Sequence, residues 1–290
     1  MPSTFAINDI PCTYATSWEE ATPNMVQSIA PYIVGKPAQE MQAAVELSKQ
    51  GKGKNQQRID DANQKYMACA MPILRHIITK GGLPFWKEFA KLTPEYYAMI
   101  IASDENPTKW CFNIELSAQL FPKWRIALKY YHGPRSYLKG MCFGEYLYAQ
   151  AQYSAWIETR SHQDLAQFFG TLYRPLRQDV SEESEEFADD CRKPFIAATS
   201  PQYAKRFYNT DENLMLHSIV YWMGCHAKMR KQYPWIFQGT SSNDSDPGAV
   251  VVGLAKSAGK DDVSQILRAS VHTIMTKLNA DAKAAAKRKR

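Results

Sequence analysis

The sequence predicts a mainly α protein, a multi-helix globular body with a small N-terminal β-hairpin and a C-terminal helical appendage. Apolar residues recur at helical spacing along most of the chain. Residues 144–175 contain two consecutive amphipathic helical patterns with a clear stop, and only residues 4–16 near the start have a hairpin pattern. The domain organisation that follows is a body over 1–238, a flexible linker over 239–248, a C-terminal helical segment over 249–280 and a basic tail over 281–290.

Length and composition favour a folded protein with a substantial core. The chain has 290 residues, of which 45% are hydrophobic and 12% aromatic, and this composition argues against global disorder. No apolar run approaches the roughly 18 residues of a membrane span. The N-terminus lacks a basic stretch followed by an apolar one. We therefore expect no membrane partner and synthesis in the cytoplasm.

The predicted hairpin turns at Asn8-Asp9, and Pro11 restricts it to the edge of a sheet because proline cannot donate a ladder hydrogen bond. Thr22 followed by Pro23 predicts the start of the first helix, with Thr22 as N-cap. The same Thr-Pro pair recurs at residues 93–94. Val26, Ile29, Ala30 and Ile33 should form the buried stripe of the first helix.

Two stretches are harder to assign. Residues 58–80 have a helical pattern that contains Pro72, which predicts a break or kink near residues 70–71. In residues 110–131 the apolar side chains from Trp124 to Tyr130 alternate as in a strand, but the surroundings also suit a helix, and both assignments stay open. The acidic residues 181–190 are typical of an exposed helix start rather than a metal site.

Residues 144–175 carry the clearest helical signal. Ser161 and Asp164 fit a capping box between the two helices, and Pro175 cannot continue the second. The expected buried residues of the pair are Tyr146, Ala149, Tyr153, Trp156 and Ile157 in the first helix and Leu165, Phe168, Phe169, Leu172 and Tyr173 in the second. Residues 211–232 predict one more long helix.

The C-terminal segment carries an apolar stripe that must dock on something. The stripe is expected to be continuous and consists of Val263, Ile266, Leu267, Val271, Ile274, Met275 and Leu278. Its partner could be the body of the chain, a second copy or a different protein, and the sequence does not choose among them.

The net charge of +6 is concentrated at the C-terminus. Residues 277–290 hold six basic residues against one acidic residue, so the rest of the chain is close to neutral. Lys287, Arg288, Lys289 and Arg290 are candidate phosphate contacts. The alternative is a solvated helix end whose cations suit the helix dipole.

The sequence predicts no catalytic, cofactor or metal site. Its six cysteines are dispersed without a CxxC pair and are expected to be reduced and mostly buried. Cys225, His226 and His217 would not share a helical face. The nearest phosphate-loop match, residues 248–257, has two residues between its second glycine and Lys-Ser, which breaks the phosphate cradle. His76 and His132 are expected to be core or loop histidines.

Three phrases resemble a loose group of tailed-bacteriophage and prophage structural or tail-assembly proteins. They are the Trp-Glu-Glu-x-Thr helix start at residues 18–22, the Phe-Gly-Glu-Tyr helix start at 143–146 followed by Leu-Tyr-Arg-Pro at 172–175, and the C-terminal amphipathic helix. The resemblance implies a non-enzymatic assembly or virion protein, located in the host cytoplasm during synthesis or in the virion. It would act through packing surfaces on other phage structural or assembly proteins or on itself.

Candidate partner contacts under this hypothesis are Trp18, Val263, Leu267, Ile274 and Leu278. Two hypotheses from other classes remain open. One is a nucleic-acid-binding accessory protein that uses the basic tail, and the other is an enzyme with a dispersed site.

Overall fold

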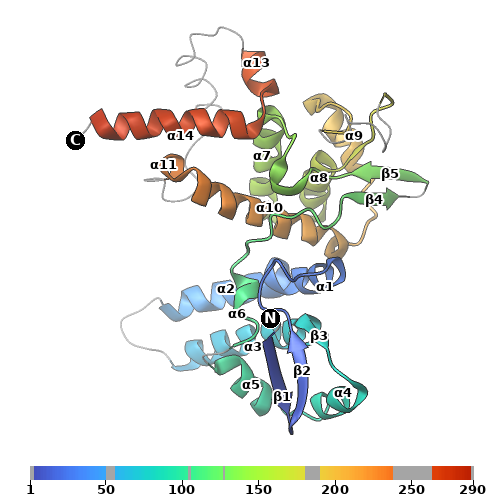
Figure 1. The fold of residues 1–290 in the computed structure, drawn as a ribbon, viewed down its shortest axis with the longest axis vertical. Coiled ribbons are helices and arrows are strands. Elements are labelled where there is room, and N and C mark those ends of the chain that lie inside the picture. The colour runs from blue at the N-terminus through green and yellow to red at the C-terminus, as the bar shows by residue number, and fades with distance from the viewer. Residues whose placement is uncertain are drawn as a thin grey trace. The chain divides into compact units, whose positions relative to one another are not determined.

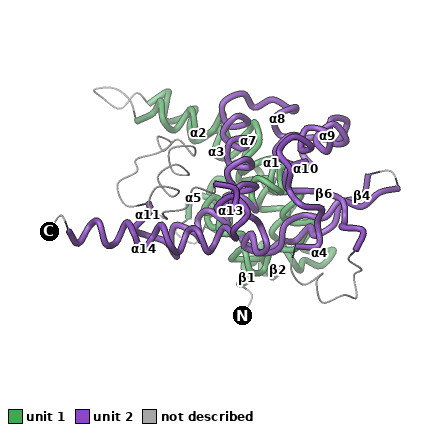
Figure 2. Tube along the Cα trace, turned by 90° about the horizontal axis from the view of Figure 1, so that it is seen from above, with its two compact units in different colours: residues 1–116, 216–220 green, residues 117–215, 221–290 purple. Residues whose placement is uncertain are grey.

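The computed structural model describes residues 3–49, 56–103, 106–126, 128–179, 190–237 and 263–288 (Figure 1). Helices make up 64% of these residues, which confirms the mainly α class. The chain divides into two compact units (Figure 2). The first unit contains residues 1–116 and 216–220, and the second contains residues 117–215 and 221–290. The predicted linker at 239–248 and the acidic residues 181–189 lie outside the described residues.

The first unit combines helices with a small antiparallel sheet. Its strands, in the order β1-β2-β3, are β1 (Ser3–Ile7), β2 (Ile10–Tyr14) and β3 (Ile78–Lys80). Its helices are α1 (Pro23–Ile33), α2 (Lys36–Lys49), α3 (Gln56–Ile77), α4 (Leu83–Phe89), α5 (Pro94–Ala102) and α6 (Lys109–Phe112).

The N-terminal hairpin is confirmed, and its turn places Asn8 and Asp9 at positive φ, which these residue types tolerate. The expectation that the hairpin lies at an edge because of Pro11 is wrong, since β2 is the middle strand. Pro11 is accommodated because β2 pairs with β3 only at Thr13 and Tyr14, beyond the proline. The predicted start of α1 is also correct, because the Thr22 hydroxyl accepts a hydrogen bond from the Met25 N–H.

The predicted break at Pro72 is absent, because α3 runs through it to Ile77 as one helix. Pro72 removes one backbone hydrogen bond. Cys69, Ala70, Ile73 and Leu74 around it are fully buried, and their apolar burial offsets that loss. The helical pattern predicts helix to Lys80, but residues 78–80 form β3.

The second unit contains a second small sheet, in the order β4-β5-β6, with β4 (Lys123–Ile126), β5 (Lys129–His132) and β6 (Arg174–Pro175). The ambiguous region 110–131 thus contains the short helix α6 and the β4–β5 hairpin rather than one element. The helices of this unit are α7 (Phe143–Thr159), α8 (His162–Leu172), α9 (Ser200–Ala204), α10 (Glu212–Gln232, of which residues 216–220 belong to the first unit), α11 (Pro234–Phe237), α13 (Val263–Arg268) and α14 (Val271–Arg288).

The predicted pair of helices at residues 144–175 is confirmed as α7 and α8, which pack on each other. Ser161 caps α8 by accepting a hydrogen bond from the Asp164 N–H at 3.0 Å. Every apolar residue expected to be buried in α8 is buried. In α7 the expectation holds for Tyr146, Ala149 and Trp156, whereas Tyr153 is half-buried. It fails for Ile157, which is 36% exposed near the C-terminal end of the helix.

The C-terminal stripe is divided between two helices instead of being continuous. The backbone of residues 141–143 pairs with residues 269–271, through Phe143 N–H to Ala269 O at 2.8 Å and Val271 N–H to Met141 O at 3.0 Å. These hydrogen bonds separate α13 from α14. Both helices pack on α7, so this stripe docks on the chain's own second unit.

Candidate basic ligand site

The candidate site begins with the β4–β5 hairpin, whose two faces differ in chemistry. Directly paired residues of an antiparallel hairpin share a face, so Trp124 and Tyr131 lie together on the inner face. Trp124 packs edge-on against Phe169 of α8, and Tyr131 packs edge-on against Phe207. This aromatic packing fixes the register of the hairpin and leaves the opposite face for polar side chains. In Figure 1 the hairpin extends outward beside α8.

The chain leaves β5 through residues 133–140, a loop with an unusual backbone. Tyr137 and Leu138 both have positive φ, at 57° and 55°, which non-glycine residues seldom adopt. The Tyr221 hydroxyl from α10 holds this conformation by donating to Arg135 O at 2.6 Å and accepting from the Leu138 N–H at 3.1 Å. Sparsely populated backbone conformations persist when the surroundings determine them, and they cluster at functional sites. Two hydrogen bonds from one buried side chain therefore hold the loop in this conformation.

Helix α14 supports the same loop from the C-terminal end of the chain. A ring nitrogen of His272 lies 2.7 Å from Tyr137 O, and the His272 and Tyr137 rings pack with centroids 4.4 Å apart. The Tyr137 hydroxyl donates to Gln232 at 2.6 Å. Burial raises the pKa of Tyr137 to about 12, and nearby Tyr233 and Cys225 add to the rise, so this hydroxyl stays protonated at neutral pH.

A hollow of about 410 Å³ lies between the hairpin and this loop. Lys123, His132, Arg135 and Lys139 line it, and no acidic side chain does so among the described residues. The other lining residues are Gln119, Pro122, Gly133, Pro134, Ser136 and Cys191. Lys123 and Lys139 are exposed, Arg135 is half-buried and His132 is buried. Three cationic side chains around one concave surface are a candidate site for an anionic ligand, because like charges gathered in a hollow attract counter-ions.

Gly133 lets the loop approach its neighbours. A Cβ at this position would lie 2.8 Å from Gln119 Nε2 and 2.9 Å from the Tyr173 ring. The Gly133 N–H donates to Pro122 O at 3.0 Å, and the Gln119 N–H donates to the Ser136 hydroxyl at 2.9 Å. The basic side chains therefore project from a backbone that is tied together on both sides of the hollow.

A buried ion-pair cluster holds the segment that contributes Cys191. Glu145 of α7 pairs with Arg174 and Arg192, whose nearest nitrogens lie 2.7 and 2.8 Å from Glu145 Oε1, and Asp190 pairs with both arginines. Burial alone would raise the pKa of the Asp190 carboxyl, but the positive charges of Arg192 and Arg174 hold the pKa below its usual value. The cluster is neutral overall and densely hydrogen-bonded, so its role is structural.

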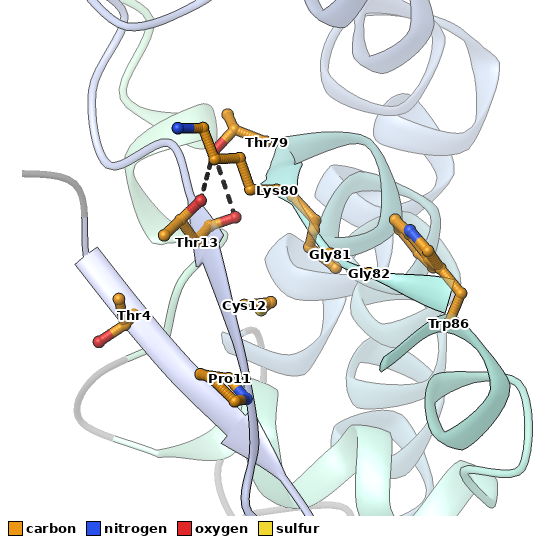
Figure 3. A pocket seen from close by; sticks show the side chains of 10 residues that line it. Thr4, Pro11, Cys12, Thr13, Thr79, Lys80, Gly81, Gly82 and Trp86 are labelled. Carbon is orange, nitrogen blue, oxygen red and sulfur yellow. Dashed lines mark hydrogen bonds between the residues drawn. The ribbon is translucent and has the colours of Figure 1, made fainter. Parts of the chain in front are cut away.

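Two other hollows lie in the first unit. One, of about 690 Å³, lies between β2 and the turn into α4, with Lys80, Thr13, Thr79 and Trp86 at its wall (Figure 3). The Thr13 and Thr79 hydroxyls are hydrogen-bonded to each other at 3.1 Å. Lys80 is the only charged residue among the described lining residues, so this hollow has little basis for charge recognition.

The other hollow, of about 700 Å³, has aromatic walls that include Trp86 and Tyr97, together with Arg75 and His76. Partial desolvation and the Arg75 charge both lower the pKa of His76, so the imidazole is neutral at pH 7. Arg75 is the one lysine or arginine among the described residues that line this hollow. It therefore has fewer cations than the hollow beside the β4–β5 hairpin, which we call the basic hollow. His76, expected to be a core or loop histidine, lies exposed on α3.

The predicted partner contacts differ in burial and lie in both units. Trp18 is buried in the first unit, where its Nε1–H donates to Asn113 O at 2.8 Å and its ring packs on Trp110. Ile274 is buried in the second unit, Leu267 and Leu278 are half-buried, and Val263 is 40% exposed. These five residues are not brought together as one surface.

The predicted phosphate contacts are only partly described. Lys287 and Arg288 are exposed in the last turn of α14, whereas Lys289 and Arg290 lie outside the described residues. The basic hollow was not predicted at all. Its residues are spread over 119–139 and 191 and become neighbours only when the hairpin and loop form. The signal that could have found it is the concentration of lysine, arginine and glycine-proline between residues 123 and 139.

Within the part of the chain that the structure describes, no group of three or more histidine, cysteine or acidic side chains is placed to hold a metal ion. None of the described helices has the length and apolar composition needed to cross a membrane. The fold and the hollow together define a mainly α protein with a hollow lined by basic side chains. Compared with protein-family models, curated proteins and solved structures, the chain matches none.

Proposed function

We propose that this protein is a non-enzymatic assembly or virion protein of a tailed phage or prophage, and that it binds nucleic acid through the phosphate groups that enter the basic hollow. The phage assignment rests on the three short phrases of the sequence. The binding assignment rests on one observation, the convergence of Lys123, Arg135 and Lys139 with His132 on one concave surface.

Protein packing through the apolar stripes has less support as the main mode of action. Trp18 and Ile274 are buried within their own units, so neither is available to a partner in this conformation. Lysine and arginine side chains around a concave surface are instead the footprint expected for phosphate contacts. We therefore favour nucleic-acid binding as the function, and we propose that the hollow, rather than the basic tail, is the main binding site.

The test is equilibrium binding of a fluorescently labelled 30-nucleotide DNA to the full chain, followed by anisotropy over a series of salt concentrations. The double variant Lys123→Ala/Lys139→Ala removes two cations from the hollow. The matched control, Lys49→Ala/Lys87→Ala, removes two exposed lysines from the first unit and changes the net charge equally. All four lysines are exposed, so unfolding curves should show little change in stability.

We expect the hollow variant to bind at least about tenfold more weakly than the control at about 100 mM salt. The slope of log K against log salt should also become shallower by about 1 to 2, because each lost phosphate contact removes about 0.7 to 0.9 from the slope. Equal affinity and equal slope for the two double variants would contradict the proposal.

A further inference from the structure

The outer face of the β4–β5 hairpin continues from the basic hollow. Arg125 pairs with Tyr130 and Lys123 pairs with His132 in the antiparallel register, so all four side chains start from the face opposite Trp124. Lys123, which is exposed, and His132, which is 4% exposed, also line the hollow. The Arg125–Tyr130 pair lies two residues further along each strand, roughly 7 Å from the first pair.

The planar guanidinium of Arg125 and the ring of Tyr130 lie next to each other, one residue pair beyond the hollow. Tyr130 is 53% exposed, and the Arg125 guanidinium carbon lies 5.9 Å from the centre of its ring. An exposed tyrosine on a strand is ordinary in isolation. Here it is next to an arginine and continuous with a basic concave surface, a combination that suits a polymer with alternating anionic and aromatic groups.

We infer that this face binds single-stranded nucleic acid, with a base stacked on the Arg125–Tyr130 pair while neighbouring phosphates enter the hollow. The inference rests on the proposed function and adds the strandedness of the ligand and the position of a base. A single strand fits because its base faces are accessible, whereas a duplex stacks its bases on one another and presents phosphates and groove edges.

The test uses Tyr130→Ala and Tyr130→Phe in the full chain. Phenylalanine keeps the ring and removes the hydroxyl, so it should retain stacking. The control is Tyr96→Ala, which truncates a comparably exposed tyrosine, 58% exposed, in the first unit. Arg125→Lys is a second variant that keeps the charge and removes the planar group. The probes are a 30-nucleotide oligo-thymidine strand, an abasic strand of equal length and a duplex of equal length.

We expect Tyr130→Ala to weaken binding of the thymidine strand by about tenfold and to leave binding of the abasic strand unchanged, because only the former has bases to stack. Tyr130→Phe and Tyr96→Ala should bind as the wild type does. Arg125→Lys should weaken binding of the thymidine strand more than that of the abasic strand. The wild type should prefer the thymidine strand to both the abasic strand and the duplex.

Two results would overturn the inference while leaving the proposed function intact. One is a Tyr130→Ala variant that binds the thymidine strand as the wild type does while the lysine variant of the hollow loses affinity. The other is equal binding of single strand and duplex. If none of the three probes binds the wild type in a salt-dependent manner, the proposed function itself fails. Selective binding of a poly-glutamate peptide in their place would assign the hollow to an acidic protein partner.

Discussion

The carboxylate of Glu145 and the guanidinium of Arg192 form a two-point ion pair inside the second unit, with Nη1 2.8 Å from Oε1 and Nη2 3.2 Å from Oε2. Both side chains are 1% exposed. The pair joins the first turn of α7 to a segment 47 residues later in the chain. Arg192 also donates to Leu172 O at the end of α8, so one side chain ties three segments together.

We predict that Glu145→Gln destabilises the protein by about 3–5 kcal/mol, because among the described residues it leaves Asp190 as the one carboxylate paired with two buried guanidinium groups. The measurement is the free energy of unfolding in urea. Glu158→Gln, at the exposed end of α7, is the matched control and should change that free energy by less than about 0.5 kcal/mol. Similar effects of the two variants would show that the cluster does not hold the fold.

Acid should weaken the same cluster. The pKa of Asp190 is lower in the folded protein than its ordinary value of 3.8, so the folded state favours the ionised carboxylate. Its contribution to stability is therefore present above about pH 4 and is lost as the pH falls through the lower folded pKa.

The check is the urea midpoint between pH 6 and pH 2.5. Asp190→Asn should flatten the acid side of this profile. Asp9→Asn should leave the profile's shape unchanged, because asparagine also tolerates the positive φ of that exposed turn. An Asp190→Asn profile as steep as that of the wild type would contradict the role assigned to the carboxylate.

Removal of the Tyr221 hydroxyl should loosen the loop that carries Arg135 and Lys139. Tyr221→Phe loses the donor to Arg135 O and leaves the buried Leu138 N–H without its acceptor, which should cost about 1–3 kcal/mol. Faster amide hydrogen exchange at residues 135–139 is the specific readout. Tyr96→Phe, on an exposed tyrosine, should show neither effect. Unchanged exchange in Tyr221→Phe would mean that the loop is held by other contacts.

Gly170 allows α8 to approach α9 closely. A Cβ at Gly170 would lie 2.6 Å from the backbone N and Cα of Ala204, and backbone atoms cannot move aside as a flexible side chain can. Gly170→Ala should therefore destabilise the protein by about 1–3 kcal/mol or more through overpacking. Gly82→Ala is the control, because its Cβ would meet Pro84 at an ordinary 3.5 Å. The measurement is the free energy of unfolding by heat or urea. Equal losses of stability in the two variants would contradict the close contact between α8 and α9.

The thiols should be slow to react in the folded protein. All six cysteines are free, and five of them are buried. Burial raises the pKa of Cys12 to about 11 and that of Cys225 to about 12. At pH 8 a thiol of pKa 11 is only about one part in a thousand thiolate, the reactive form. We expect slow reaction of the native chain with Ellman's reagent and rapid reaction of six thiols in urea. Rapid native reaction of several thiols would contradict the described core.

Local sequence signals predicted the helical class and several boundaries. The Thr22-Pro23 start, the Ser161 cap and the buried face of α8 follow from short-range rules that the structure confirms. The break predicted at Pro72 is absent because the burial of its neighbours outweighs one lost hydrogen bond. The division between α13 and α14 also depends on a long-range effect, the pairing of residues 269–271 with 141–143, which helical periodicity cannot predict.

The candidate site was harder to predict than the fold. Lys123, Arg135 and Lys139 are separated by a strand pair and a loop, and nothing in their spacing shows that they surround one hollow. The same is true of the ion-pair cluster, whose members lie at residues 145, 174, 190 and 192. The concentration of charge in the tail predicted phosphate contacts at residues 287–290, but net charge does not report where a concave surface forms.

The most direct test of the central claim compares the hollow with the tail in one binding experiment. Lys123→Ala/Lys139→Ala alters the hollow, and substitution of glutamine for Lys283, Lys287, Arg288, Lys289 and Arg290 removes five charges from the tail. Binding of the 30-nucleotide thymidine strand at about 100 mM salt is measured for each full-length variant. We predict that the hollow variant loses more affinity than the tail variant although it loses fewer charges. A tail variant that abolishes binding, beside a hollow variant that binds as the wild type does, would contradict the account.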